Sequence, residues 1–178
     1  MQKTDWTPMH SSQRQDWETP PELWARVERH FGPFDLDAAA TAKTAKCKRF
    51  FTPETNALTR SWDANRVWLN PPYGRSIGSW VQKAWEEAQT KGGPRVAVLT
   101  FARTDTVWWH KYAILAEYIV FLKGRVAFLA DGQRQASAPA PSVLLCFGPT
   151  SSQPPKLAAW DWKNDFAPIG FAGRGRWS

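Results

Sequence analysis

Apolar side chains recur at helical spacing in three segments of the chain, and this periodicity predicts three helices. The first helix is expected over residues 20–31, where a Gly-Pro pair ends the pattern. Thr19 is expected to cap this helix, with Pro20 at its first position and Glu22 completing a capping box. The chain therefore enters its first helix through a short, proline-stiffened segment.

The remaining elements alternate between helices and apolar strands. The second and third helices are expected over residues 77–88, with Glu87 on the polar face, and over residues 106–115, with Trp108 on the apolar face. Short apolar runs predict strands at 34–37, 48–51, 67–69, 96–101, 118–122, 125–129 and 142–147. The predicted fold class is α/β: a mostly parallel sheet, helices on both faces, and an antiparallel edge pair because the last two strands lack an intervening helix.

A chain of 178 residues fits one domain. Residues 1–15 are polar and are expected to be flexible, residues 16–148 to form the folded domain, and residues 149–178, rich in Pro, Gly and Trp, to be a loosely ordered tail. No apolar stretch approaches the ~18 residues that span a membrane, and the N-terminus lacks a signal core. A cytoplasmic location is therefore expected.

Composition narrows the choice of partner. The two cysteines, Cys47 and Cys146, and the three histidines have no metal-ligand spacing, so no metal site is expected. The formal charge of +7 favours a polyanionic partner, most simply nucleic acid, although a merely basic protein would show the same balance. The 12 tryptophans are expected to divide between core positions and faces that stack on bases.

The tetrapeptide Asn70-Pro71-Pro72-Tyr73 carries the candidate chemistry. It follows a predicted strand and precedes a predicted helix, where open parallel sheets place their ligand sites. The side-chain oxygen of Asn70 and the carbonyl of Pro71 can accept both hydrogens of a planar amino group, and Tyr73 can stack on the base. Two prolines stiffen the loop. A proline-rich turn with Asn70 capping the next helix is the alternative interpretation.

The chain resembles the phage-type DNA adenine-N6 methyltransferases over most of residues 16–148. The shared motifs are residues 16–21, 34–41, 45–47, 51–54, 70–75, 102–106, 137–139 and 141–142. The resemblance implies a Rossmann-like methyltransferase fold and S-adenosylmethionine as the methyl donor. It also implies that the donor is bound by Thr19, Pro20, Asp37, Ala38 and Glu54, the last at the ribose hydroxyls. Many methyltransferases have a glycine-rich turn after the first strand, and here the residues are Ala38-Ala39-Ala40-Thr41.

The expected substrate is double-stranded DNA with the target adenine flipped out of the helix. Arg75 and Arg103 are expected to meet phosphates, whereas Lys123 and Arg125 are expected to be solvated surface charges. Trp62 is assigned to the core. The alternatives are methylation of cytosine N4, of RNA or of protein glutamine, and a non-catalytic nucleic-acid-binding protein. Neither the recognition sequence nor the oligomeric state has a signature in the sequence.

Overall fold

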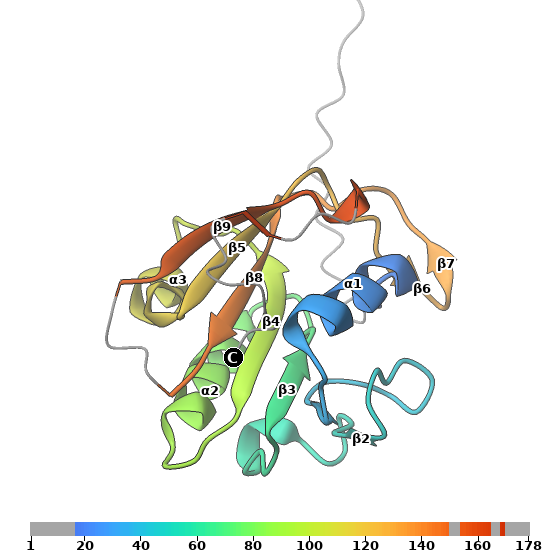
Figure 1. The fold of residues 1–178 in the computed structure, drawn as a ribbon. Helices are drawn as coiled ribbons and strands as arrows, with labels where there is room; N and C mark the ends of the chain where they lie inside the picture. Colours follow the sequence, from blue (N-terminus) through green and yellow to red (C-terminus); the bar gives the residue numbers. More distant parts are fainter. Residues whose placement is uncertain (1–16, 150–153, 165–167, 170–178) are drawn as a thin grey trace, which may run out of the picture.

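A seven-stranded sheet forms the centre of the structure, a computed structural model that describes residues 17–149, 154–164 and 168–169 (Figure 1). Its strands are β1 (Leu36–Asp37), β2 (Arg49–Phe50), β3 (Arg66–Leu69), β4 (Arg95–Phe101), β5 (Tyr118–Leu122), β8 (Ser142–Phe147) and β9 (Lys156–Trp160). They lie in the order β2-β1-β3-β4-β8-β5-β9. The expectation for residues 1–15 lies outside the described residues.

The pairing confirms a mostly parallel sheet. Strands β2, β1, β3 and β4 are mutually parallel, as are β5 and β9. Strand β8 is antiparallel to both of its neighbours and lies between β4 and β5 rather than at an edge. Every residue of β8 is buried, so its apolar side chains suit an interior position. Residues 156–160 extend the sheet beyond residue 148.

The strand expected at residues 125–129 is wrong in extent. Only Leu129–Ala130 is a strand, β6, and it pairs with β7 (Gln133–Arg134) in a hairpin separate from the main sheet. Asp131 and Gly132 turn this hairpin with φ of 52° and 75°, as a two-residue turn of the primed kind requires. The residues before the hairpin form a hydrogen bond with the loop after it: Ala138 donates its N–H to the carbonyl of Val126.

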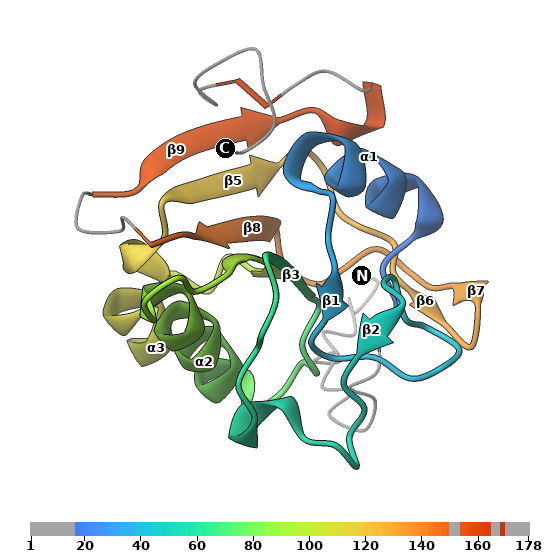
Figure 2. The same cartoon turned by 60° about the horizontal axis from the view of Figure 1, so that its bottom comes forward.

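Helices cover both faces of the sheet, as expected (Figure 2). Helix α1 (Pro21–Phe31) lies on one face, and α2 (Ile77–Gln89) and α3 (Val107–Lys111) lie on the other. Successive residues of a strand point to opposite faces. Ala97 and Leu99 of β4 therefore join the core beneath α1, and Val96 and Val98 join the core beneath α2 and α3. No helix among the described residues has the length and apolar character needed to cross a membrane.

Three details of the predicted helices are wrong. Pro20 is the N-cap of α1, and Glu22 forms an ion pair with Arg134 of β7 instead of closing a capping box with Thr19. The helix expected over 106–115 breaks at Tyr112 into α3, in which Trp109 is buried and Trp108 packs partly buried against the core, and a 3-10 turn, η2 (Ala113–Leu115). Glu87 is buried, because it bonds to a loop beside α2.

Candidate active site

The candidate site lies where the carboxyl ends of three parallel strands meet. Leu36 is in register with Val67, and Leu69 with Val98, so β1, β3 and β4 end at the same edge of the sheet. Asp37 ends β1 and Asn70 directly follows β3. This is the position at which open α/β sheets bind ligands.

A cavity of about 380 Å³ opens at this edge. Its volume falls in the ~300–1,000 Å³ range of pockets that hold small molecules and cofactors. The lining combines small and aromatic apolar side chains with a few polar ones. Among the expected site residues, the lining includes Thr19, Asp37, Ala38, Asn70 and Pro72.

Asn70 presents a buried hydrogen-bond acceptor to this cavity. Its Nδ2 donates to the carbonyl oxygen of Trp17 at 2.5 Å, which fixes the orientation of the amide because a carbonyl can only accept. Its Oδ1 is then buried without a partner. An unsatisfied buried acceptor costs ~1–3 kcal/mol, so this arrangement fits a residue whose bond is completed by a ligand. Asn70 does not cap the next helix, because α2 has Ser76 as its N-cap.

The other residues of the tetrapeptide, which we call the catalytic loop after its expected role, divide between the cavity and the core. Pro71 is buried, and half-buried Pro72 lines the cavity. The Tyr73 ring packs on Phe101 and Phe128, with centroids 4.5 Å and 5.6 Å away. Its hydroxyl donates to the carbonyl of Leu99 at 3.2 Å, and burial raises its pKa, which keeps it protonated. Tyr73 therefore lies beside the cavity lining, and its stacking on a base stays a prediction.

Asp37 closes the turn after β1 and also lines the cavity. Its carboxylate accepts the backbone N–H of Ala39 at 3.2 Å and that of Lys46 at 2.9 Å. Burial raises the pKa of Asp37 to about 6, although these two bonds and the Lys46 charge act in the opposite direction. In the alanine turn after β1, the backbone N–H of Ala38 donates to the carbonyl of Trp68 in β3, and that of Ala40 donates to the carbonyl of Phe51, which follows β2.

The other residues expected at the donor divide into two groups. Thr19 lines the cavity, and its Oγ1 is a second buried oxygen without a partner. Pro20 is buried next to it but is absent from the lining. Glu54 is exposed on a turn and also lies outside the lining, while neighbouring Thr52 and Pro53 belong to it. Only three of the five expected donor residues therefore reach the cavity.

Several lining residues were missed by sequence reasoning. They include Glu18, Lys46, Asn56, Trp80 and Asp131. Four of these lie on loops and turns, where no periodicity marks them, and Trp80 has the spacing of a core residue of α2. Burial lowers the pKa of Lys46, whereas the nearby carboxylates of Asp37 and Glu18 raise it. The cavity thus carries charges of both signs.

The cations outside the cavity differ in their surroundings. Arg75 follows the catalytic loop, Arg103 follows β4, and both are exposed at the same edge of the sheet. Lys123 pairs with Asp161 at 2.6 Å, and Arg125 donates to the carbonyl of Ala138 at 3.3 Å. Both residues are exposed, as expected for surface charges, although each also bonds to a protein group.

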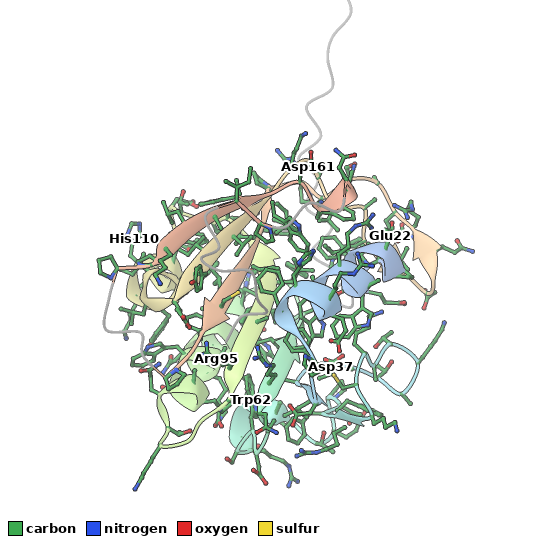
Figure 3. All side chains as sticks on the ribbon, in the orientation of Figure 1. Glu22, Asp37, Trp62, Arg95, His110 and Asp161 are labelled. Carbon is green, nitrogen blue, oxygen red and sulfur yellow. The ribbon has the colours of Figure 1, made fainter. Side chains whose placement is uncertain are left out.

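His110, Cys47 and Cys146 are not in the cavity lining. Figure 3 shows His110, a residue of α3, away from Asp37, and its Nε2 lies 2.8 Å from the carbonyl oxygen of Thr104. Cys47 and Cys146 are free thiols, and burial raises the pKa of Cys47 to about 12. Within the described part of the chain, no three His, Cys, Asp or Glu side chains cluster as a metal site would require.

The lining of the cavity suits a ligand with apolar, polar and cationic parts. Thr19 Oγ1, a buried oxygen without a partner, supplies an acceptor. Aromatic and alanine side chains supply apolar faces, and the acidic Glu18, Asp37 and Asp131 supply negative charge near a cationic group.

Comparisons with known proteins agree with this geometry. A family model described as DNA N-6-adenine-methyltransferase (Dam) matches residues 7–166. The DNA N-6-adenine-methyltransferase of Escherichia phage T1 is 36% identical over 121 residues, which make up 67% of this chain and 50% of that protein. The protein of the same name from Haemophilus phage HP1 is 30% identical over 137 residues, 75% of this chain and 78% of that protein. The chain thus spans half the length of its phage T1 relative.

Proposed function

The chain belongs to the DNA N-6-adenine-methyltransferase family, and we propose that it transfers a methyl group from S-adenosylmethionine to the N6 amino group of adenine in DNA. The observation that carries this proposal is the unpartnered Oδ1 of Asn70 at the lining of the cavity. A ligand with an N–H group can donate the hydrogen bond that this oxygen lacks. The amino group of a base is such a ligand.

The catalytic loop acts on the amino group of the base. The N6 lone pair of adenine is delocalised into the ring, which makes the nitrogen a weak nucleophile. Asn70 Oδ1 and the carbonyl of Pro71 accept its two hydrogens and favour a tetrahedral nitrogen with a localised lone pair. Bond formation between N6 and the methyl carbon accompanies cleavage of the carbon–sulfur bond, and the surplus N6 proton leaves to water. This chemistry needs no strong base.

The chain's own residues hold the two reactants in line. S-adenosylmethionine, when bound, supplies a methyl group made electrophilic by the adjacent sulfonium. We assign Thr19, Asp37 and the alanine turn of the cavity lining to the donor, and Asn70 of the same lining to the base. Tyr73 holds the base by stacking once the adenine is extruded. Positioning and preorganised acceptors account for the catalysis.

DNA binding follows from charge. The formal charge of +7 attracts a polyanion, and exposed Arg75 and Arg103 follow β3 and β4, two of the strands at whose carboxyl ends the cavity opens. We assign both arginines to phosphates of duplex DNA, whose target adenine swings out toward Asn70. Each phosphate contact releases counterions, so affinity should fall steeply with salt.

The proposal is tested with methyl-labelled S-adenosylmethionine, unmethylated DNA and nucleoside mass spectrometry. The expected product is N6-methyladenine, and Asn70→Ala should remove it while DNA binding largely survives. Cytosine N4, RNA bases and protein glutamine also present planar amino groups, so N4-methylcytosine as the sole product would overturn the assignment to adenine. If no base is modified and Asn70→Ala leaves binding unchanged, the protein is a non-catalytic DNA binder.

A further inference from the structure

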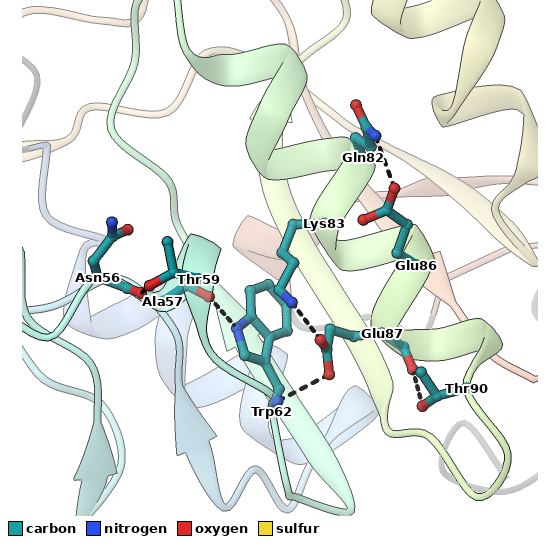
Figure 4. A network of polar contacts seen from close by, with 9 residues as sticks. All are labelled: Asn56, Ala57, Thr59, Trp62, Gln82, Lys83, Glu86, Glu87 and Thr90. Atoms are coloured by element: carbon teal, nitrogen blue, oxygen red, sulfur yellow. Dashed lines mark hydrogen bonds and ion pairs between the residues drawn. The ribbon is translucent and has the colours of Figure 1, made fainter.

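A network of polar contacts links α2 to one side of the donor cavity (Figure 4). We call residues 52–57 the cavity wall, because Thr52, Pro53, Asn56 and Ala57 all line the cavity. The wall precedes a 3-10 turn, η1 (Ala57–Thr59), and has little regular backbone pairing of its own. Its position therefore depends on side-chain contacts as well as on β2, which ends just before it.

Trp62 fixes the end of the wall. Its indole Nε1–H donates to the carbonyl of Ala57 at 2.9 Å, and the side chain is only 1% exposed. The hydroxyl of Thr59 donates to the carbonyl of Asn56 at 3.0 Å. Asn56 has a φ of 48°, in the left-handed region that few residues adopt unless their surroundings hold them there. These contacts define the turn at which the wall meets the cavity.

Glu87, a residue of α2, connects Trp62 and the end of the cavity wall to that helix. One carboxylate oxygen accepts the backbone N–H of Trp62 at 2.8 Å, and the other forms an ion pair with Lys83 at 2.5 Å. Glu87 is 7% exposed, so the bond to Trp62 is charge-assisted and shielded from water. The neighbouring Glu86 is exposed and bonds only along the helix surface, to Gln82 at 2.7 Å.

Helix α2 also begins directly after the catalytic loop, and its Trp80 lines the same cavity. We propose that Glu87 is a positioning residue for the methyl donor: through Trp62 it fixes the cavity wall against the helix that follows the catalytic loop. The wall and the catalytic loop are thereby set relative to each other by one rigid element. This inference rests on the proposed function, because it takes the cavity to be the donor site.

The test measures the Kd of S-adenosylmethionine by calorimetry, together with the Tm of the protein without donor. In Glu87→Met the side chain keeps its length but loses the acceptor, and we expect donor binding to weaken by about tenfold or more. In Glu87→Gln an amide oxygen still accepts from Trp62, so affinity should stay within about threefold of wild type. Glu86→Gln is the matched control and should bind the donor as wild type does.

Trp62→Phe supplies a second, independent variant, in case Glu87→Met does not fold. It keeps the backbone N–H that Glu87 accepts and removes the indole bond to Ala57, together with part of the buried ring. We expect about threefold to tenfold weaker donor binding. In kinetic assays both variants should raise the KM for the donor more than they lower kcat, because Asn70 is untouched.

The outcomes separate the two ideas. If Glu87→Met lowers the Tm but leaves the donor Kd unchanged, the anchor only stabilises the fold and the inference is wrong. Equal loss of affinity in Glu87→Gln and Glu87→Met would show that the acceptor is not what matters. If the wild-type protein itself binds no donor, the proposed function fails, whatever Glu87 does.

Discussion

The two halves of the sheet are built in opposite ways. Strands β4, β8 and β5 are five to seven residues long and pair along their lengths, with almost every side chain buried and apolar. Strands β1 and β2 have two residues each, and loops surround them. The short half nevertheless holds the cavity, together with the buried carboxylate of Asp37 and the unpartnered oxygen of Thr19.

This difference shows how the chain separates stability from function. Long apolar strands gain burial and satisfied backbone bonds. A cavity requires short strands, turns and polar groups that stay unsatisfied until a ligand arrives, and such regions contribute less to stability. Asn70 stands at the boundary, since β3 pairs with β1 on one side and with β4 on the other. We therefore expect the protein to stay folded when polar groups of the cavity are removed, because the long half supplies most of the stability.

The largest expected effect comes from Asn70→Ala. Removal of a preorganised acceptor typically costs a factor of ~10²–10³ in kcat, and we expect the upper end of that range or more because Oδ1 contacts the reacting group in the proposed mechanism. The Tm should change by only a few degrees, because the lost contact is one bond to the Trp17 carbonyl. Labelled-methyl transfer and thermal unfolding measure the two effects. Unaltered kcat would remove Asn70 from the chemistry.

The opposite pattern is expected for Leu144→Ala in β8. Leu144 is fully buried beneath α1, so the truncation leaves a cavity and should lower the free energy of unfolding by about 3 kcal/mol. At temperatures where the variant stays folded, the Kd of S-adenosylmethionine should match that of wild type. Denaturant titration and calorimetry provide both numbers. A large loss of donor affinity in the folded variant would contradict the conclusion that the long half determines stability and the short half determines donor binding.

Asp37 makes the stability of the short half depend on pH. Its pKa is about 6 in the folded protein and 3.8 without the fold, so the native state binds more protons between these values. Stability from this group is therefore present at pH 4 and is lost as pH rises through 6. Asp37→Asn should lack this loss, and its free energy of unfolding relative to wild type should rise by roughly 2 kcal/mol between pH 4 and pH 7. If the free energy of unfolding had the same pH dependence in wild type and Asp37→Asn, the raised pKa of the buried Asp37 would be contradicted.

Sequence patterns were most informative in the long half. The apolar runs of β4, β5 and β8 were found within one residue of their ends, because burial leaves a direct imprint on side-chain type. The insertion of β8 between β4 and β5 was not predicted, since pairing partners far apart in sequence leave no local pattern. The hairpin at Asp131 was missed although Asp131-Gly132 is a dipeptide typical of such turns, because its strands have two residues each and leave no alternating pattern.

The candidate site was predicted from short sequence motifs more than from the periodicity of apolar residues. Asn70 and Asp37 could be placed because each ends a strand, and the carboxyl ends of parallel strands share an edge. Lys46, Asn56 and Asp131 could not be found in this way, because loops of irregular conformation bring them to the cavity. Glu54 shows the same problem in reverse: the motif around it reaches the lining, but its own side chain lies on the exposed side of the turn.

The smallest effect is expected for Tyr73→Phe, at the contact between the catalytic loop and the long half of the sheet. Tyr73 belongs to the catalytic loop, yet its ring packs with Phe101 at the end of β4 and its hydroxyl bonds to Leu99 within that strand. Tyr73→Phe keeps the ring and removes one hydrogen bond, so the free energy of unfolding should fall by about 1 kcal/mol. The kcat should fall less than about tenfold, because a phenyl ring still stacks on a base. Tyr73→Ala is the matched comparison and should impair both properties more, since it removes the ring that joins the loop to the long half. If Tyr73→Phe reduced kcat as severely as Asn70→Ala does, the hydroxyl would take part in the reaction itself, and the long half would no longer be only a support for the catalytic loop.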